Sequence, residues 1–216
     1  MSKHLQRDLD ALKKQLVYVG SLVEEAINFA MIALLDRREE ISEQVINSDS
    51  RIDAQEIEME ENCLKVLALH QPMAGDLRFI VSVLKVNMDL ERMGDMAVNI
   101  AQRAKYLSRQ DPLGATIDFE LMVEKVRNMV RKSLDALVNL DTVTARQVVA
   151  ADDEVDELNK QMFDVLQDMM RKDATLVERA VDTLSASRHL ERIADLATNI
   201  AEDVVFMVDG EVIRHG

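Results

Sequence analysis

The sequence predicts an all-α protein made of two tandem, pseudo-repeated antiparallel three-helix bundles. Apolar residues make up 48% of the 216 residues but aromatic residues only 3%, which favours aliphatic packing between helices over a sandwich or barrel. Six glycines and two prolines leave room for few turns, so the elements must be few and long. A segment also repeats after one hundred residues, which divides six long helices between two similar halves.

Three helices are predicted in the first half. Apolar residues recur at spacings of three and four from Leu5 onward, which predicts the first helix. A second helix would begin after the break at "LLDRREE", with Asp36 as its N-cap, and run to His70. After "HQPMAGD", Pro72 suits the start of a third helix that ends near Leu107.

The stretch "SRQDPLGATID" combines Pro, Gly, Ser and Asp, and so marks a boundary between a first bundle at residues 1–110 and a second at residues 111–216. Beyond it, one helix is predicted from about Thr116 and another after "DTVTA". A third would begin near Asp173, where the T-x-x-E pattern of Thr175 favours a capping box. Short turns between these helices imply antiparallel neighbours.

The repeat has two parts. "LERMGDMAVNIA" from residue 90 matches "LERIADLATNIA" from residue 190 at eight of twelve positions. Upstream, "DSRID" (residues 49–53) answers "DDEVD" (residues 152–156) at an offset of 103. A repeat at this long period indicates a duplicated domain rather than a solenoid, because each unit is large enough for its own core.

Each copy carries a ladder of polar residues at steps of four, which lie in one slanted column of a helix. The first ladder is Glu91, Asp95 and Asn99, and the second is Glu191, Asp195 and Asn199. Stepping back from the first ladder leads to Met88, Leu84, Ile80 and Leu77, and from the second to Leu184, Ala180 and Val177. The carboxylates are therefore predicted to lie in line with an apolar, buried stripe.

Carboxylates in such a place must become neutral, find a cation or lose several kcal/mol to desolvation. If adjacent helices pack side by side, Asp49 and Asp53 meet the first ladder, and Asp152 and Asp156 meet the second. A hard divalent or trivalent metal ion with oxygen ligands would resolve the crowding. The asparagines would add a carbonyl ligand or orient a carboxylate. The alternative is a solvated face, because the chain has 40 acidic residues and such spacings arise by chance.

Composition also bounds the compartment and the partners. A net charge of −14 argues against a nucleic-acid groove and suits cations or basic protein surfaces. The single cysteine, Cys63, excludes an intramolecular disulfide and fits a reducing compartment as a packed core thiol. The polar N-terminus does not resemble a signal peptide, and no run approaches ~20 uninterrupted apolar residues. A cytoplasmic protein that meets a membrane only through partners is predicted.

The stretches "HQPMAGDLR", "NMDLERMGDMAVNIA" and "LERIADLATNIAEDV" together resemble the PhoU family of phosphate-specific transport regulators. The resemblance covers nearly the whole chain and implies metal clusters on the ladders, with iron, zinc, manganese and magnesium all left open, and a homodimer. The second half has Ala194 where the first has Gly94, and its upstream loop "RKDATLVER" lacks the first-half pattern, so the two sites need not be equal.

The same resemblance implies a cytoplasmic negative regulator of phosphate uptake and of the phosphate-starvation response. Such a protein is no enzyme; it acts as an adaptor between the ATPase subunit of the phosphate ABC transporter and a sensor histidine kinase. An alternative is a di-metal carboxylate enzyme or metal-storage protein, although such bundles usually add a Glu-x-x-His motif that is missing here. A purely structural dimeric bundle with empty ladders is the third reading.

Overall fold

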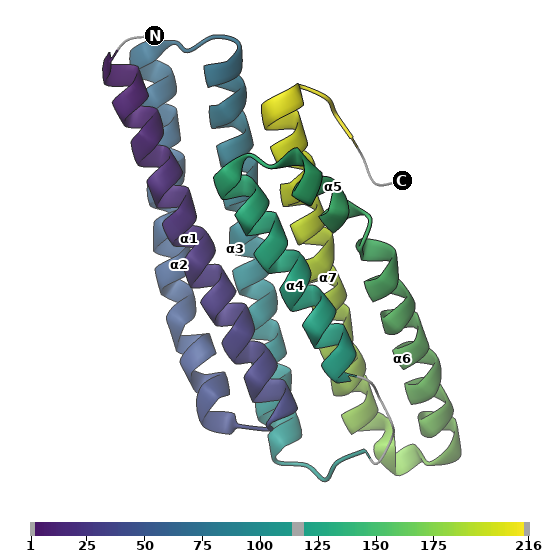
Figure 1. The fold of residues 1–216 in the computed structure, drawn as a ribbon. Coiled ribbons are helices and arrows are strands. Elements are labelled where there is room, and N and C mark those ends of the chain that lie inside the picture. Colours follow the sequence, from purple (N-terminus) through teal and green to yellow (C-terminus); the bar gives the residue numbers. More distant parts are fainter. Residues whose placement is uncertain (1–2, 114–118, 214–216) are drawn as a thin grey trace.

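The computed structural model describes residues 3–113 and 119–213, and the predicted all-α fold with six long helices is confirmed (Figure 1). A short helix, α5, and one 3₁₀ turn, η1, add to the six. In chain order the elements are α1 (Lys3–Leu35), α2 (Glu39–His70), α3 (Gly75–Ser108), α4 (Phe119–Asn139), α5 (Thr142–Val149), α6 (Asp152–Lys172), η1 (Ala174–Leu176) and α7 (Val177–Asp209).

The helices form two bundles side by side, α1–α3 in one half and α4, α6 and α7 in the other (Figure 1). α3 packs along α7 and so joins the halves, with α2 on the far side of α3 and α6 on the far side of α7. α1 and α4 cover one side of this α2–α3–α7–α6 layer and touch each other. We call the opposite, outward side of the layer the four-helix face. The buried apolar side chains of both halves belong to one continuous core.

The helix predicted after "DTVTA" is in fact two helices. α5 already begins at Thr142, because the Asp141 side chain caps it by accepting hydrogen bonds from the backbone N–H of Val143 (3.0 Å) and of Thr144 (3.2 Å). The chain then turns, and α6 starts at Asp152. The acidic pair of the second half therefore begins in the first turn of α6, where the helix dipole favours negative charge.

Two predicted helix starts in the first half are also wrong. Asp36 lies in the turn directly after α1, where its N–H still donates to the carbonyl of Ile32 (2.9 Å). Arg38 takes the N-cap position of α2 without a side-chain cap. α3 begins at Gly75, three residues after Pro72. Neighbouring polar and proline residues thus mark these breaks correctly but do not fix the first helical residue.

The predicted capping box before α7 does not form. The Asp173 carboxylate instead accepts hydrogen bonds from the Thr175 N–H (2.9 Å) and hydroxyl (2.7 Å), which caps the turn η1, and α7 begins at Val177. The predicted helix start at Thr116 lies outside the described residues, and α4 is described from Phe119.

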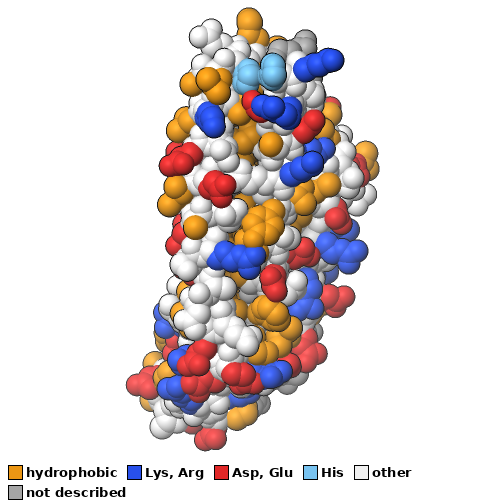
Figure 2. Space-filling view, turned by 90° about the vertical axis from the view of Figure 1, so that its left-hand side faces the viewer, with side chains coloured by type: hydrophobic (Ala, Val, Ile, Leu, Met, Phe, Trp, Pro, Cys, Tyr) orange, Lys and Arg blue, Asp and Glu red, His pale blue; other side chains and the backbone are white. Residues whose placement is uncertain are grey.

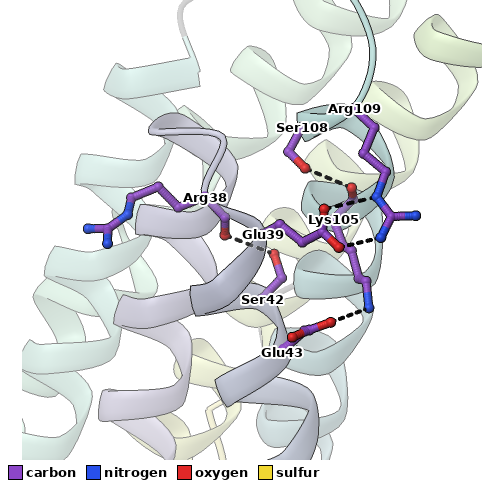
Figure 3. A network of polar contacts seen from close by, with 7 residues as sticks. All are labelled: Arg38, Glu39, Ser42, Glu43, Lys105, Ser108 and Arg109. Carbon is purple, nitrogen blue, oxygen red and sulfur yellow. Dashed lines mark hydrogen bonds and ion pairs between the residues drawn. The ribbon is translucent and has the colours of Figure 1, made fainter.

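Ion pairs join the start of α2 to the end of α3 (Figure 3). Lys105 Nζ lies 2.8 Å from Glu43 Oε1, and Arg109 Nε lies 2.9 Å from Glu39 Oε2. Because these groups are partly or well exposed, water and salt screen their attraction, so the pairs orient the helix ends more than they stabilise them.

Of the helices in the described residues, α1 is long and apolar enough to cross a membrane by length and composition. In the structure, 56% of that apolar stretch is buried against other helices, as expected for a core helix, which passes the same test. The outward-facing sides of α1 and α2 carry charged residues of both signs mixed with apolar ones (Figure 2). Two pockets of about 280 and 200 Å³ lie between these helices.

Candidate metal centre

The packing of α2 on α3 brings the first acidic pair to the first ladder. Asn87 of α3 donates a hydrogen bond to the carbonyl of Glu56 on α2 (2.9 Å). Seven residues further along α3, Gly94 lets Ile52 approach so closely that a Cβ there would lie 3.2 Å from Ile52 Cδ1. This register places residues 49–53 of α2 beside residues 91–95 of α3, as the sequence predicts.

The ladder does not lie in line with the core, however. Leu77 and Met88, which were predicted to share its buried stripe, are 41% and 49% exposed, and Glu91 is only half-buried. The fully buried stripe of α3 runs instead through residues such as Leu90 and Met93. Ile80 of the predicted stripe is fully buried and Leu84 is half-buried, so the stripe follows the margin of the core and is not buried along its whole length.

The second ladder lies at the same kind of margin. Ala180 is buried, but Val177 is 40% exposed and Leu184 is half-buried. Glu191 is half-buried as well, and Asp195 is exposed. Both ladders therefore point to the four-helix face, on the side of the layer away from α1 and α4.

Crowding of negative charge is evident in the first ladder. Burial raises the pKa of the Asp49 carboxyl, and the charges of Asp53 and Asp95 raise it further. Burial likewise raises the pKa of Glu91, followed by the charges of Asp95, Glu56 and Asp53. Arg92 opposes this shift only weakly. Its guanidinium lies 3.6 Å from the carboxylate of Asp89 instead.

Glu56 is a member of this cluster that the sequence reasoning missed. Burial raises its pKa, and the charges of Glu60 and Asp53 add to the shift. The signal was available in the sequence, since Glu56 follows Asp53 by three residues and so lies on the same side of α2. The first ladder thus brings together five carboxyl groups, which are Asp49, Asp53, Glu56, Glu91 and Asp95.

The second ladder repeats the arrangement with one difference. Burial raises the pKa of Glu191, the charges of Asp195 and Asp156 raise it further, and Arg188 opposes them. The position of Glu56 is taken by Asn159, whose side-chain oxygen accepts a hydrogen bond from Ser187 (2.7 Å). The second half therefore holds one carboxylate fewer, and the two sites are chemically unequal.

The asparagines take different places. Asn99 is half-buried on α3. Asn199 is exposed and lines a pocket of about 240 Å³ over the α3–α7 seam, together with Lys85, Asp89 and Asp203. Asn199 therefore faces α3 rather than α6. In the same pocket, burial and the charge of Asp203 raise the pKa of Asp89 to about 6.

Oxygen donors dominate both ladders, and this set suits hard cations. Within the described ranges 3–113 and 119–213, no group of three or more His, Cys, Asp or Glu side chains is arranged to hold an ion as it stands. An ion would have to draw the half-exposed carboxylates together by rotation of their side chains. The nearby His189 is turned elsewhere, with Nδ1 3.3 Å from the sulfur of Met96, so it does not complete a Glu-x-x-His site.

The fold and site define a duplicated six-helix protein with a carboxylate ladder in each half. The chain belongs to the PhoU family, because the PhoU domain model matches residues 16–104 and 119–204. The two matched segments correspond to the two bundles.

Relatives match over nearly their whole length. The chain is 40% identical over 98% of its residues to an Aquifex aeolicus protein named phosphate-specific transport system accessory protein PhoU homolog, and covers 96% of that protein. It superposes on the crystal structure of PhoU from Pseudomonas aeruginosa with a TM-score of 0.93 at 35% identity, covering 95% of this chain and 99% of the other. The Streptococcus pneumoniae phosphate transport system regulatory protein PhoU gives a TM-score of 0.90 at 27% identity, covering 98% and 100%.

Proposed function

We propose that this protein is a regulator of a phosphate-specific transport system that holds down phosphate uptake and the phosphate-starvation response when phosphate is plentiful. Support comes from relatives named as accessory or regulatory proteins of such systems, which align over nearly their full length. The protein acts by contact rather than catalysis. As a cytoplasmic homodimer, it would link the ATPase subunit of the transporter to a sensor histidine kinase, and it would meet the membrane only through these partners.

We further propose that both ladders bind metal ions. The observation that carries this proposal is the packing of α2 on α3 and of α6 on α7, which gathers half-exposed carboxylates of the two helices in one place. Burial and neighbouring carboxylates accordingly raise the pKa of Asp49, Glu91 and Glu191. A cation relieves this repulsion. The first site would use Asp49, Asp53, Glu91 and Asp95 with Asn99, and the second Asp152, Asp156, Glu191 and Asp195 with Asn199. Iron, zinc, manganese and magnesium all accept such oxygen ligands.

A bound ion would supply positive charge where α2 meets α3 and where α6 meets α7. It would tie each helix pair together and change the charge of the four-helix face, which we propose as the surface that a partner meets. Metal occupancy would thereby tune contact with the partners without taking part in a reaction. Glu56 would join the first site as a further carboxylate.

Elemental analysis of the purified protein tests the metal proposal. The Glu91→Ala/Asp95→Ala and Glu191→Ala/Asp195→Ala variants are each expected to lose one site's share of bound metal. The matched control is Glu120→Ala/Glu124→Ala, an exposed acidic pair with the same spacing on α4. Metal content that is equal in all four proteins contradicts the proposal.

The regulatory role is tested in cells. Deleting the gene is expected to switch on phosphate-starvation genes in phosphate-rich medium, and a plasmid copy should restore repression. Reporter activity that stays low in the deletion strain would contradict the role whatever the metal content is.

A further inference from the structure

A groove runs between α6 and α7 on the four-helix face. Its volume is about 560 Å³, against 200 to 380 Å³ for the four other pockets described on the surface. Its walls are the facing sides of α6 between residues 156 and 163 and of α7 between residues 181 and 191. Because α6 and α7 are antiparallel, residue numbers rise along one wall and fall along the other, so Asp156 at the start of one wall lies near Glu191 at the end of the other.

The groove has three zones of different chemistry, each about one helical turn, or ~5 Å, long. Phe163 of α6 lies at the apolar end with Val181 and Leu184 of α7. The middle zone is basic and holds Lys160 and Arg188. The far zone is acidic, with Asp156 and Glu191 of the second ladder. A partner that fits must therefore match an ordered pattern and not only a net charge.

Among residues 3–113 and 119–213, none covers the apolar zone completely. Phe163 is 45% exposed and Val181 is 51% exposed, although both stand on well-formed long helices. Large apolar side chains grouped in a groove and rimmed by charge mark an interaction site. Covering them removes apolar surface from water, which provides the driving force for docking.

The first half does not repeat this pattern. By the offsets of the repeat, Glu60 stands at the position of Phe163, Ile57 at that of Lys160 and Met88 at that of Arg188. The order of apolar and charged side chains is thus different in the α2–α3 crevice, so the ordered groove belongs to the second half. The two halves share the same helix arrangement, but they differ in the residues at these positions, and these residues determine what each half can bind.

We propose that the α6–α7 groove docks an amphipathic helix of a partner protein whose successive turns toward the groove are apolar, acidic and basic. The apolar turn covers Phe163 and Val181, and the acidic turn meets Lys160 and Arg188. In the metal-free protein, the basic turn meets Asp156 and Glu191, which a bound ion would otherwise occupy. Helix-in-groove recognition uses anchors at this spacing. The order of charge fixes the direction and register of the helix, since a reversed order places like charges opposite each other. The inference deepens the adaptor role proposed above and rests on it.

A designed peptide tests the groove with the full-length protein. The probe is a fluorescent helical peptide of about four turns, with leucines on two turns, then glutamates, then lysines, all on one face. The control peptide has the same composition and net charge but has glutamates and lysines exchanged. Fluorescence anisotropy with a chelator present is expected to give a Kd at least about tenfold lower for the probe than for the control peptide.

Variants locate the binding. Val181→Ser is expected to raise the Kd of the probe about fivefold, because it removes an apolar anchor. Asp156→Asn/Glu191→Gln should raise the Kd about as much and reduce the preference for the probe over the control peptide. Val143→Ser, an exposed valine on α5, and Glu120→Gln/Glu124→Gln on α4 should leave the Kd unchanged. Circular dichroism of each variant checks that the fold is retained.

Equal affinity for the two peptides overturns the proposal, and so does equal weakening by the groove variants and their controls. Sedimentation adds an independent outcome: if Val181→Ser changes the oligomeric state, the groove is an interface between copies and not a peptide site. If the groove does not prefer the probe peptide but deleting the gene still abolishes repression in cells, the regulatory role stands and only the groove proposal is wrong. Loss of repression in the deletion strain is measured without any peptide, so the two failures are distinguishable.

Discussion

Lys85 Nζ lies 2.9 Å from Asp203 Oδ1, and this ion pair joins α3 to α7 across the seam between the two halves. Asp203 is buried, whereas the Lys85 side chain is 55% exposed and also lies 5.4 Å from the ring centre of Phe206. Burial raises the pKa of Asp203, and the ammonium group of Lys85 opposes that shift. The seam therefore holds a buried charge whose compensation depends on one lysine.

Lys85→Met should remove this compensation while keeping the apolar stem. A carboxyl whose folded-state pKa is raised destabilises the fold when it is ionised, and the penalty disappears as the pH falls below that pKa. We expect a loss of about 1 kcal/mol in the free energy of unfolding near neutral pH, discounted for the exposure of Lys85. The deficit should shrink in acid, as urea unfolding at several pH values would show.

Lys14→Met on α1 is the matched control, because Lys14 is exposed and no acidic partner is described for it. It should change stability little at any pH. A Lys85→Met deficit that grows in acid would contradict the account of the seam.

The close approach of Gly94 and Ile52 predicts a coupling between the two positions. Gly94→Ala would place a Cβ 3.2 Å from Ile52 Cδ1, and Ile52→Val deletes that atom. The second half carries this pair already, with Ala194 and Val155 at the equivalent positions. The double variant should therefore lose less free energy of unfolding than the two single variants lose together, by about 0.5 kcal/mol or more. Additive free energies of unfolding would show that the contact relaxes without cost.

Most of this fold could be predicted from the sequence, because long runs of apolar residues at spacings of three and four, together with few glycines, leave few alternatives to helix. The repeat at Glu91 and Glu191 predicted where the second and third helices of each half meet. Helix ends were less predictable, since several local bonds compete for the same few residues. Asp141 and Asp173 each bind the backbone two residues on, and these caps moved the starts of α5 and η1.

The ladders show a second limit. Sequence spacing identified the carboxylates that meet, but it placed them on a buried stripe because it took apolar residues at helical spacing to be buried along the whole helix. The stripe from Leu77 to Glu91 alternates steps of three and four, so its rotation nearly cancels, yet Ile80 is buried whereas Leu77 and Met88 are exposed. In the second ladder, two steps of four turn Asn199 about 80° away from Glu191, toward α3. Which margin a residue reaches depends on the helices packed beside it, and one sequence does not state that.

Cys63 should be unreactive in the folded protein. It is fully buried, and burial together with the charge of Glu60 raises the pKa of its thiol to about 12. Since the thiolate is the reactive form, labelling by a thiol reagent near pH 8 should be at least about a hundredfold slower than in denaturant. Ser50→Cys, exposed on α2, provides a fast-reacting control. Rapid labelling of native Cys63 would show that α2 opens locally.

Neutralising the first ladder should have opposite effects with and without metal. Without metal, the raised pKa of Glu91 means that its charge destabilises the fold near neutral pH, so Glu91→Gln should gain about 0.5 kcal/mol. With Mn²⁺, the wild-type protein should gain in Tm because the ion binds only the folded ladder, and Glu91→Gln should gain less. Thermal unfolding in chelator and in Mn²⁺ measures both, with Glu124→Gln on α4 as the control. A variant that is less stable in chelator, or that gains as much from Mn²⁺ as the wild-type protein, would contradict a metal site built on Glu91.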